Sequence, residues 1–180
     1  MSEIDSTTPD DDSRPSAADS CAMAIGYVCI EWGLLEGTFD RFMRQLFGWS
    51  HRDETTHILN MNIRQSEKIT IIRAVGTAQS PSLDWLERLT RTLTTIDNDI
   101  RPLRNRFVHD MWLISQHEPL LRRTRTTKIS RPQARQIEVS AFSDRSTQVS
   151  EILDLVTKIR EASEELNRLA DDYGAFRHQN

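Results

Sequence analysis

The sequence predicts an all-α fold: an antiparallel four-helix bundle with a small β-hairpin or extended flap between its third and fourth helices. Three long segments repeat apolar residues at alternating intervals of three and four, which places these side chains on one stripe of an α-helix. Each stripe runs for about six or seven turns, a length that suits helices packed in a bundle. A chain of 180 residues can also bury a core within one domain.

The N-terminal segment differs in composition from the rest of the chain. It is rich in Asp, Ser, Thr and Pro, and six of the 27 acidic residues lie in the first 20 positions, against one of the 23 basic residues. Such a segment cannot bury enough apolar surface to fold. We expect residues 1–16 to form a disordered acidic tail and residues 17–180 to form one helical domain that is close to neutral in charge.

The first predicted helix is a long core helix and ends near Gly48. Its stripe consists of Ile25, Val28, Trp32, Leu35, Phe39, Phe42 and Leu46. A shorter second helix is expected from about Arg64 to Val75. The last helix has the stripe Val149, Ile152, Val156, Ile159, Ser163, Leu166, Ala170 and Tyr173. These helices supply three members of the bundle.

The third predicted helix opens at Pro81-Ser82 and reaches Phe107. Its stripe consists of Leu86, Leu89, Leu93, Ile96, Ile100, Leu103 and Phe107. Pro102 lies inside this pattern and lacks a backbone N–H, so it should kink or loosen the helix near its C-terminal end.

A different pattern separates the third and fourth helices. Residues 111–114, 120–121 and 136–140 are β-prone or alternating, and Pro119 and Pro132 interrupt them. Six basic residues occur there with no acidic residue between them: Arg122, Arg123, Arg125, Lys128, Arg131 and Arg135. Guanidinium groups bind phosphates in a bidentate manner, so these residues are predicted RNA contacts. The alternative is a solvated edge hairpin whose charges block aggregation.

The end of the third helix carries the candidate catalytic residues Arg104, Asn105 and His109. The segment from Arg52 to His57 has the same Arg-x4-His spacing, but it lies in a polar stretch that would not fix the side chains. In a regular helix Arg104 and His109 point about 140° apart. We therefore expect them to converge only where the helix frays or where two copies meet, which favours a dimeric site. The alternative is simple capping of the helix C-terminus by basic side chains.

The motif and its setting resemble the HEPN domains, a family of four- or five-helix proteins that often act as RNases. The resemblance rests on Arg104-Asn105-x-x-x-His109 at the end of the third long helix. The long first helix with Trp32 and Glu36, the short second helix and the extended segment after His109 support it. It covers roughly residues 17 to 175.

The resemblance implies that Arg104 and His109 meet at a dimer interface and cleave RNA without a metal ion, and that Asn105 orients them. HEPN toxins that are paired with a nucleotidyltransferase antitoxin typically carry Tyr two residues after the His. Here that position is Met111, so we do not expect neutralisation by modification of that residue.

The expected function is a metal-independent endoribonuclease of toxin or defence type that acts as a homodimer. His109 would take the proton of the ribose 2′-OH and Arg104 would stabilise the phosphorane, leaving a 2′,3′-cyclic phosphate and sparing DNA. RNA and a regulatory or antitoxin protein are the expected partners. The alternative function is a non-catalytic helical module for dimerisation or for binding RNA or protein.

Other chemistries lack sequence support. His51, Asp53 and His57 fit a polar loop better than a metal site, and no Gly-rich phosphate loop is present, so we expect no metal and no cofactor. No segment approaches the roughly 20 apolar residues of a membrane span, and no signal peptide is recognisable. We therefore expect a cytoplasmic protein without a membrane partner.

Overall fold

The computed structural model describes residues 15–49, 58, 60, 62–113, 121–125 and 142–179. Over these ranges the chain is mostly helical and carries one small three-stranded antiparallel sheet. Residues 1–14 of the expected acidic tail lie outside the described residues. Ser16, the last residue assigned to that tail, is instead the N-cap of the first helix.

Helix α1 (Ala17–Phe47) is closed at both ends by local hydrogen bonds. At its start the Ser16 hydroxyl accepts from the Asp19 backbone N–H, and the Asp19 carboxylate accepts from Ser16, which forms a capping box. At its end Gly48 adopts the left-handed conformation, with φ 66°, and its N–H bonds to the carbonyls of Arg44 and Gln45. A glycine permits this cap because it has no Cβ. The predicted end near Gly48 is confirmed.

The second and third predicted helices correspond to four described elements, α3 (Gln65–Ala78), α4 (Leu83–Thr95), the π-helical turn η1 (Ile96–Ile100) and α5 (Arg101–His109). The last three are continuous. The turn η1 immediately precedes Pro102, which lacks an N–H and whose ring crowds the carbonyl four residues earlier. The Arg101 N–H bonds to Ile96, five residues back, which widens the helix there. The expected loosening before the motif is therefore present.

The sheet lies between α5 and α6 and has the strand order β1-β2-β3. Its strands are β1 (Met111–Leu113), β2 (Leu121–Arg125) and β3 (Phe142–Ser146). It therefore has one strand more than the expected hairpin. The predicted strand-like segment at residues 136–140 lies outside the described residues. In the strand register, Trp112 on β1 lies opposite Arg122 on β2, and Arg123 on β2 lies opposite Asp144 on β3.

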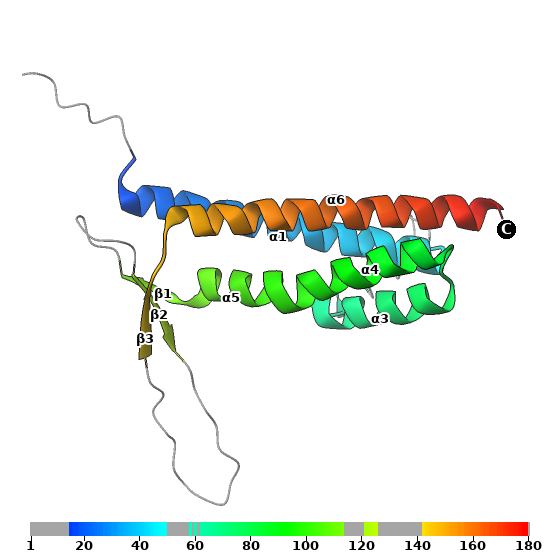
Figure 1. Ribbon diagram of the computed structural model, residues 1–180, viewed down its shortest axis with the longest axis horizontal. Coiled ribbons are helices and arrows are strands. Elements are labelled where there is room, and N and C mark those ends of the chain that lie inside the picture. Colours follow the sequence, from blue (N-terminus) through cyan, green and yellow to red (C-terminus); the bar gives the residue numbers. More distant parts are fainter. Residues whose placement is uncertain are drawn as a thin grey trace, which may run out of the picture.

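Helix α6 (Val149–Gln179) runs parallel to α1, which corrects the expected antiparallel arrangement. Three contacts follow the same order along both helices: Glu31 with Arg160, Thr38 with Ser163, and the Leu46 carbonyl with Arg177. The reason is that the sheet lies where α5 ends, which is also where α1 begins (Figure 1). Because α6 follows β3, it starts at that end and runs in the direction of α1.

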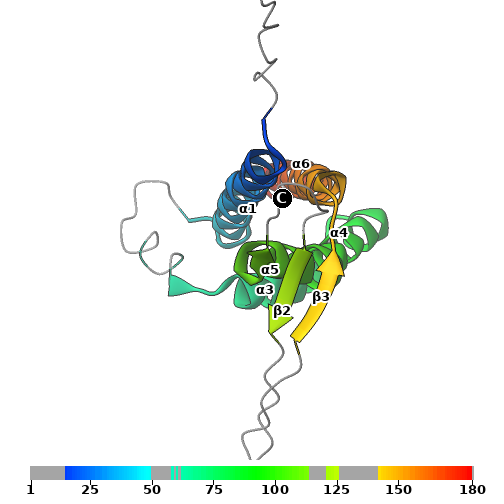
Figure 2. The same ribbon diagram turned by 90° about the vertical axis from the view of Figure 1, so that its left-hand side faces the viewer.

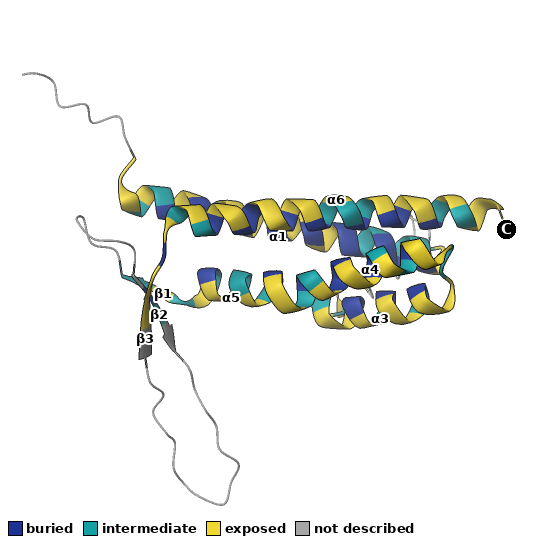
Figure 3. Ribbon diagram, viewed as in Figure 1, coloured by how far each residue is buried: buried dark blue, intermediate teal, exposed yellow. Residues whose placement is uncertain are grey.

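The helices form two layers around one core. Figure 2 shows α1 and α6 side by side above α5 and α3. Helix α4 runs opposite to α6, since the Trp85 indole donates to the Leu169 carbonyl (2.9 Å) and Arg88 bonds to Glu165 (2.8 Å). Buried residues recur along the helices between exposed ones (Figure 3), as the apolar stripes predicted. One contiguous cluster joins residues of α1, α3, α4, η1, α5 and α6.

Helix α1 is long and apolar enough to cross a membrane, judged by length and composition. An 18-residue window within it has a mean hydropathy of 1.2, whereas we expected no segment to approach such a span. One side of α1 is nevertheless fully buried in the core, at Val28, Leu35 and Phe39. Core helices of soluble proteins also satisfy this criterion, so the hydropathy does not assign α1 to a membrane.

Candidate functional site

The candidate site lies at the C-terminal end of α5, beside the sheet. The helix ends at His109 because the chain turns extended at Asp110 (φ −72°, ψ 156°), whose N–H bonds to the Arg106 carbonyl at 3.0 Å. The indole of Trp112 then donates to the Phe107 carbonyl at 2.9 Å. These bonds satisfy carbonyl groups that would lack partners at a helix end. They hold the last turn, and with it His109, in a defined position.

Arg104 and His109 meet within a single chain. Arg104 Nη1 lies 3.4 Å from His109 Nε2, although the two Cα–Cβ bonds leave the helix in different directions. The expectation that one helix keeps these groups apart is therefore wrong. The reason is the length of the arginine side chain, which reaches around the last turn to an imidazole at the helix end. A second copy is not needed to bring the two groups together.

Asn105 fixes the guanidinium of Arg104. Its side-chain oxygen accepts a hydrogen bond from Arg104 Nη1 at 3.1 Å, so one nitrogen of Arg104 faces both Asn105 and His109. Asn105 and His109 are exposed, while Arg104 is partly buried. The three predicted catalytic residues are thus adjacent, with the amide and the imidazole open to solvent.

Two further residues of the site, Trp32 and Glu36, come from α1. The Arg104 guanidinium carbon lies 5.2 Å from the centre of the Trp32 ring, a cation–π contact. The Trp32 side chain is buried, and its indole N–H donates to Glu36 Oε1 at 2.8 Å. The sequence placed Trp32 on the core stripe, and Trp32 and Glu36 otherwise served only as support for the family resemblance. The spacing of four between them was visible, but the approach of Trp32 to Arg104 depends on how α1 packs on α5.

The Arg104–His109 contact depends on the tautomer of the imidazole. A guanidinium can only donate, so the 3.4 Å approach is a hydrogen bond where Nε2 accepts. Arg104 Nε is itself buried without a hydrogen-bond partner among the described residues, so the guanidinium is held from one side by the Trp32 ring. An accepting imidazole next to a cation is the arrangement of a general base beside an anion-binding group.

The capping alternative receives no support from the hydrogen bonds. Within the described part of the chain, the last carbonyls of α5 accept from Asp110 N–H and the Trp112 indole. No bond links Arg104 or His109 to a helix carbonyl in these ranges. Their polar atoms are directed toward each other and toward Asn105.

Arg122 has a packing role that differs from the expected RNA contact. Its side chain is only 3% exposed, and its guanidinium lies over the Phe107 ring at 5.0 Å. Arg122 Nε is 3.4 Å from Asp110 Oδ2, the residue after His109. Burial lowers the pKa of Arg122 below its usual value, and the Asp110 carboxylate acts in the opposite direction. In this conformation the guanidinium is not presented to solvent.

The remaining basic residues of the flap are only partly described. Arg123 forms a bidentate pair with Asp144 on β3, at 2.7 and 2.8 Å, and this pair raises the pKa of Arg123 and lowers that of Asp144. Arg125 ends β2, but its side chain is not described. Lys128, Arg131 and Arg135 lie outside the described residues. The second Arg-x4-His match, from Arg52 to His57, and the residue His51 also lie outside them.

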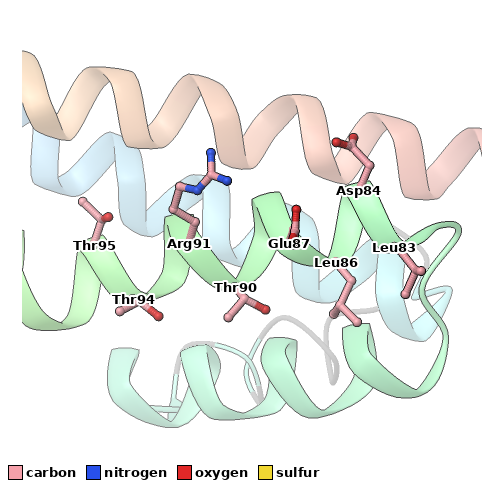
Figure 4. A pocket seen from close by; sticks show the side chains of 8 residues that line it. All are labelled: Leu83, Asp84, Leu86, Glu87, Thr90, Arg91, Thr94 and Thr95. Atoms are coloured by element: carbon pink, nitrogen blue, oxygen red, sulfur yellow. The ribbon is translucent and has the colours of Figure 1, made fainter.

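The motif is on the open surface and not in the groove that the structure shows along α4. That groove, of about 740 Å³, is lined by one face of α4 (Figure 4) and contains none of the motif residues. Its lining residues are Leu83, Asp84, Leu86, Glu87, Thr90, Arg91, Thr94 and Thr95. Among the described residues no group of three or more His, Cys, Asp or Glu could hold a metal ion.

Comparison with known proteins provides no family for this chain. No protein-family model matches it, and neither the curated proteins nor the solved structures contain a significant match.

Proposed function

We propose that the protein is a metal-independent endoribonuclease of toxin or defence type that acts as a homodimer. The contact between Arg104 and His109 supports this proposal most directly. It places an accepting imidazole nitrogen 3.4 Å from a guanidinium nitrogen on an exposed helix end. An imidazole that takes the proton of a 2′-OH and a guanidinium that binds the phosphate would need no metal ion and no cofactor.

The proposed reaction uses the RNA's own nucleophile. The substrate phosphate takes over the Arg104 Nη1–H, which frees His109 Nε2. Nε2 then takes the proton of the ribose 2′-OH, and the 2′ oxygen attacks the adjacent phosphorus. Arg104 stabilises the negative charge of the phosphorane, held in place by Asn105 and by the face of Trp32. The bond to the 5′ oxygen breaks, and the imidazolium or water returns a proton to that oxygen. The products are a 2′,3′-cyclic phosphate and a free 5′-OH.

We also propose a bundle architecture, partners and a cellular location for the protein. We assign α1, α3, the continuous helix from α4 to α5, and α6 to a four-helix bundle with the sheet at one end. RNA is the proposed substrate, and a further protein, such as an antitoxin, is the proposed regulator. We place the protein in the cytoplasm. Arg123, Arg125 and the basic residues that follow them are the proposed RNA contacts, whereas Arg122 is buried.

Cleavage of labelled RNA in EDTA tests this function. We expect wild-type protein to cleave RNA and to leave a cyclic phosphate, and Arg104→Ala and His109→Ala to lower the rate about 100-fold or more. Arg91→Ala and His178→Ala are matched controls, because both residues are exposed and lie away from α5. The controls should cleave at the wild-type rate.

An all-deoxy substrate of the same sequence should remain intact, because it lacks the 2′-OH. Cleavage of that substrate at a similar rate would exclude the mechanism. Wild-type rates in both motif variants would exclude the proposed residues. A folded wild-type protein that binds RNA without cleaving it would favour the alternative, a non-catalytic module for dimerisation or for binding RNA or protein.

A further inference from the structure

The side of α1 that faces away from the core carries large apolar residues in contact with solvent. Met23 is 54% exposed, Tyr27 44%, Ile30 59% and Leu34 60%. Their spacing of four, three and four places them on one stripe of the helix. The stripe lies on the side of α1 away from the buried Val28 and Leu35, which face the core. We call it the outer stripe.

Three glycines, Gly26, Gly33 and Gly37, form a second row beside the outer stripe. A Cβ atom built on any of them would meet nothing within 4 Å, and none has a positive φ. The packing of the single chain therefore does not require glycine at these positions, although glycine weakens a helix. Glycines along a helix face permit close approach of another backbone.

We propose that the outer stripe and the glycine row form an interface with a second copy of this chain, in which two α1 helices pack antiparallel around a two-fold axis at Ile30. In such a pair, a residue a given number of positions before Ile30 faces the residue the same number after it. The facing pairs are Met23 with Gly37, Tyr27 with Gly33, Leu34 with Gly26, and Ile30 with itself. Each bulky side chain other than Ile30 thus meets a glycine.

The same register places opposite charges near each other at both ends of α1. Asp19 and Arg41 each lie eleven residues from Ile30, along the same side of α1. Antiparallel packing places Asp19 of one copy near Arg41 of the other at both ends of the interface. Asp19 is exposed and bonds to Ser16 of its own capping box. Arg41 is 40% exposed and already bonds to Asn167 and Asp171 on α6, so the contact between copies would be an additional one for both residues. Parallel packing would instead place Asp19 against Asp19 and would oppose bulky residues to bulky residues.

The interface would also place the two candidate sites on the same face of the dimer, a consequence that rests on the proposed function. The axis of an antiparallel pair is perpendicular to both helices, so both copies present the same side. Trp32 and Glu36 lie within six residues of Ile30, about 9 Å along the helix. Trp32 is buried and lies about 160° around α1 from the exposed Ile30. Each Arg104 would therefore lie on the far side of its own α1 from the interface, and each chain would keep its own site.

Light scattering after size exclusion tests the interface on the full chain. We expect wild-type protein to be a dimer at about 10–100 µM and Ile30→Arg to be a folded monomer, because it places two buried cations against each other. Leu83→Arg is the control, since Leu83 is 83% exposed on α4 and should leave the dimer intact. A dimer that persists in Ile30→Arg would overturn the proposal.

Disulfide cross-linking tests the direction of packing. The exposed Cys29 is first replaced by Ser, while the buried Cys21 is kept. A mixture of Met23→Cys and Gly37→Cys proteins should form a mixed disulfide faster than either protein cross-links to itself. Faster self-linking of the Met23→Cys protein would indicate parallel helices and reject the register.

Gly33→Ala separates the interface from the stability of the single chain. The added methyl has free space in the monomer, so the thermal midpoint at low protein concentration should rise. The same methyl faces Tyr27 of the other copy, so dimerisation should weaken about tenfold or more. An unchanged dimer affinity would count against the proposed close approach.

The outcomes distinguish this inference from the proposed function. A wild-type dimer that depends on Ile30 but cleaves no RNA supports the interface and rejects the RNase. RNA cleavage by a wild-type protein that stays monomeric at about 100 µM rejects the interface and the homodimer but keeps the RNase activity. Binding of the monomer to phospholipid vesicles that is lost in Ile30→Arg would assign the stripe to a membrane surface and would also overturn the proposal.

Discussion

The reach of a single side chain decides the geometry of the candidate site. Backbone directions alone separate Arg104 from His109, yet Nη1 and Nε2 lie 3.4 Å apart because the arginine extends around the end of α5. The position of the guanidinium then depends on Trp32, whose ring it covers at 5.2 Å. A flexible side chain that lies on a buried aromatic surface loses fewer alternative conformations when it binds an anion. Trp32 is therefore a positioning residue for Arg104.

Trp32→Leu should lower RNA cleavage about tenfold more than Trp32→Phe, because only Phe keeps an aromatic face for Arg104. Both changes remove the indole N–H that donates to Glu36, so loss of that bond affects them equally. Cleavage rates and urea unfolding curves are compared for both variants. Equal cleavage rates at similar stability would mean that the ring does not position Arg104.

The contacts between elements tie the sheet to the helix that carries the motif. Arg122 on β2 is buried between the Phe107 ring and the Asp110 carboxylate, and both partners flank the last turn of α5. The strand register supports this arrangement, since Arg122 pairs with the partly buried Trp112. The element that was expected to bind RNA therefore also anchors the end of α5. Upstream, η1 accommodates Pro102 and keeps α4 and α5 continuous.

Arg122→Ala should lower the free energy of unfolding by about 2–4 kcal/mol, because it leaves the Asp110 carboxylate without this cation and uncovers the Phe107 ring. Arg122→Lys should recover little of the loss, since an ammonium cannot replace the planar group over the ring. Urea unfolding measures both. Arg123→Ala is the control: it breaks an exposed ion pair and should have a much smaller effect. Equal losses for Arg122→Ala and Arg123→Ala would contradict the anchoring role.

At the scale of the whole molecule, one core connects both layers of helices. Leu166 on α6 is fully buried in the same cluster as Val28 on α1 and Leu93 on α4. Polar contacts join α1 to the parallel helix α6, for example between Thr38 and Ser163. The antiparallel helix α4 is joined to α6 by the bond from Trp85 to the Leu169 carbonyl. Since every long helix contributes to this cluster, loss of packing at one helix should affect all of them.

The described helices should therefore unfold as one unit. Far-ultraviolet circular dichroism and tryptophan fluorescence should report the same urea midpoint. Leu166→Ala should lower the stability by about 2–5 kcal/mol and shift both signals together. The exposed Leu153 provides the control, because Leu153→Ala should shift neither by more than about 0.5 kcal/mol. Separate midpoints for the two signals would indicate that the layers unfold independently.

The sequence by itself determined the local features of this protein. Apolar periodicity predicted the long helices, Gly48 predicted the end of the first, and Pro102 predicted the loosened turn before the motif. It also singled out Arg104, Asn105 and His109. These features depend on residues within one or two turns of each other, so hydrogen bonding and side-chain spacing along the chain are enough to infer them.

Only the tertiary structure decided how these parts meet. The parallel course of α1 and α6, the burial of Arg122 and the approach of Trp32 to Arg104 each join residues far apart in the sequence. Local patterns do not encode such contacts, because helix directions depend on where the connecting segments begin and end. The length of an arginine side chain also lets one residue serve a phosphate, a carboxylate or an aromatic ring, and its neighbours in space decide which of these it meets.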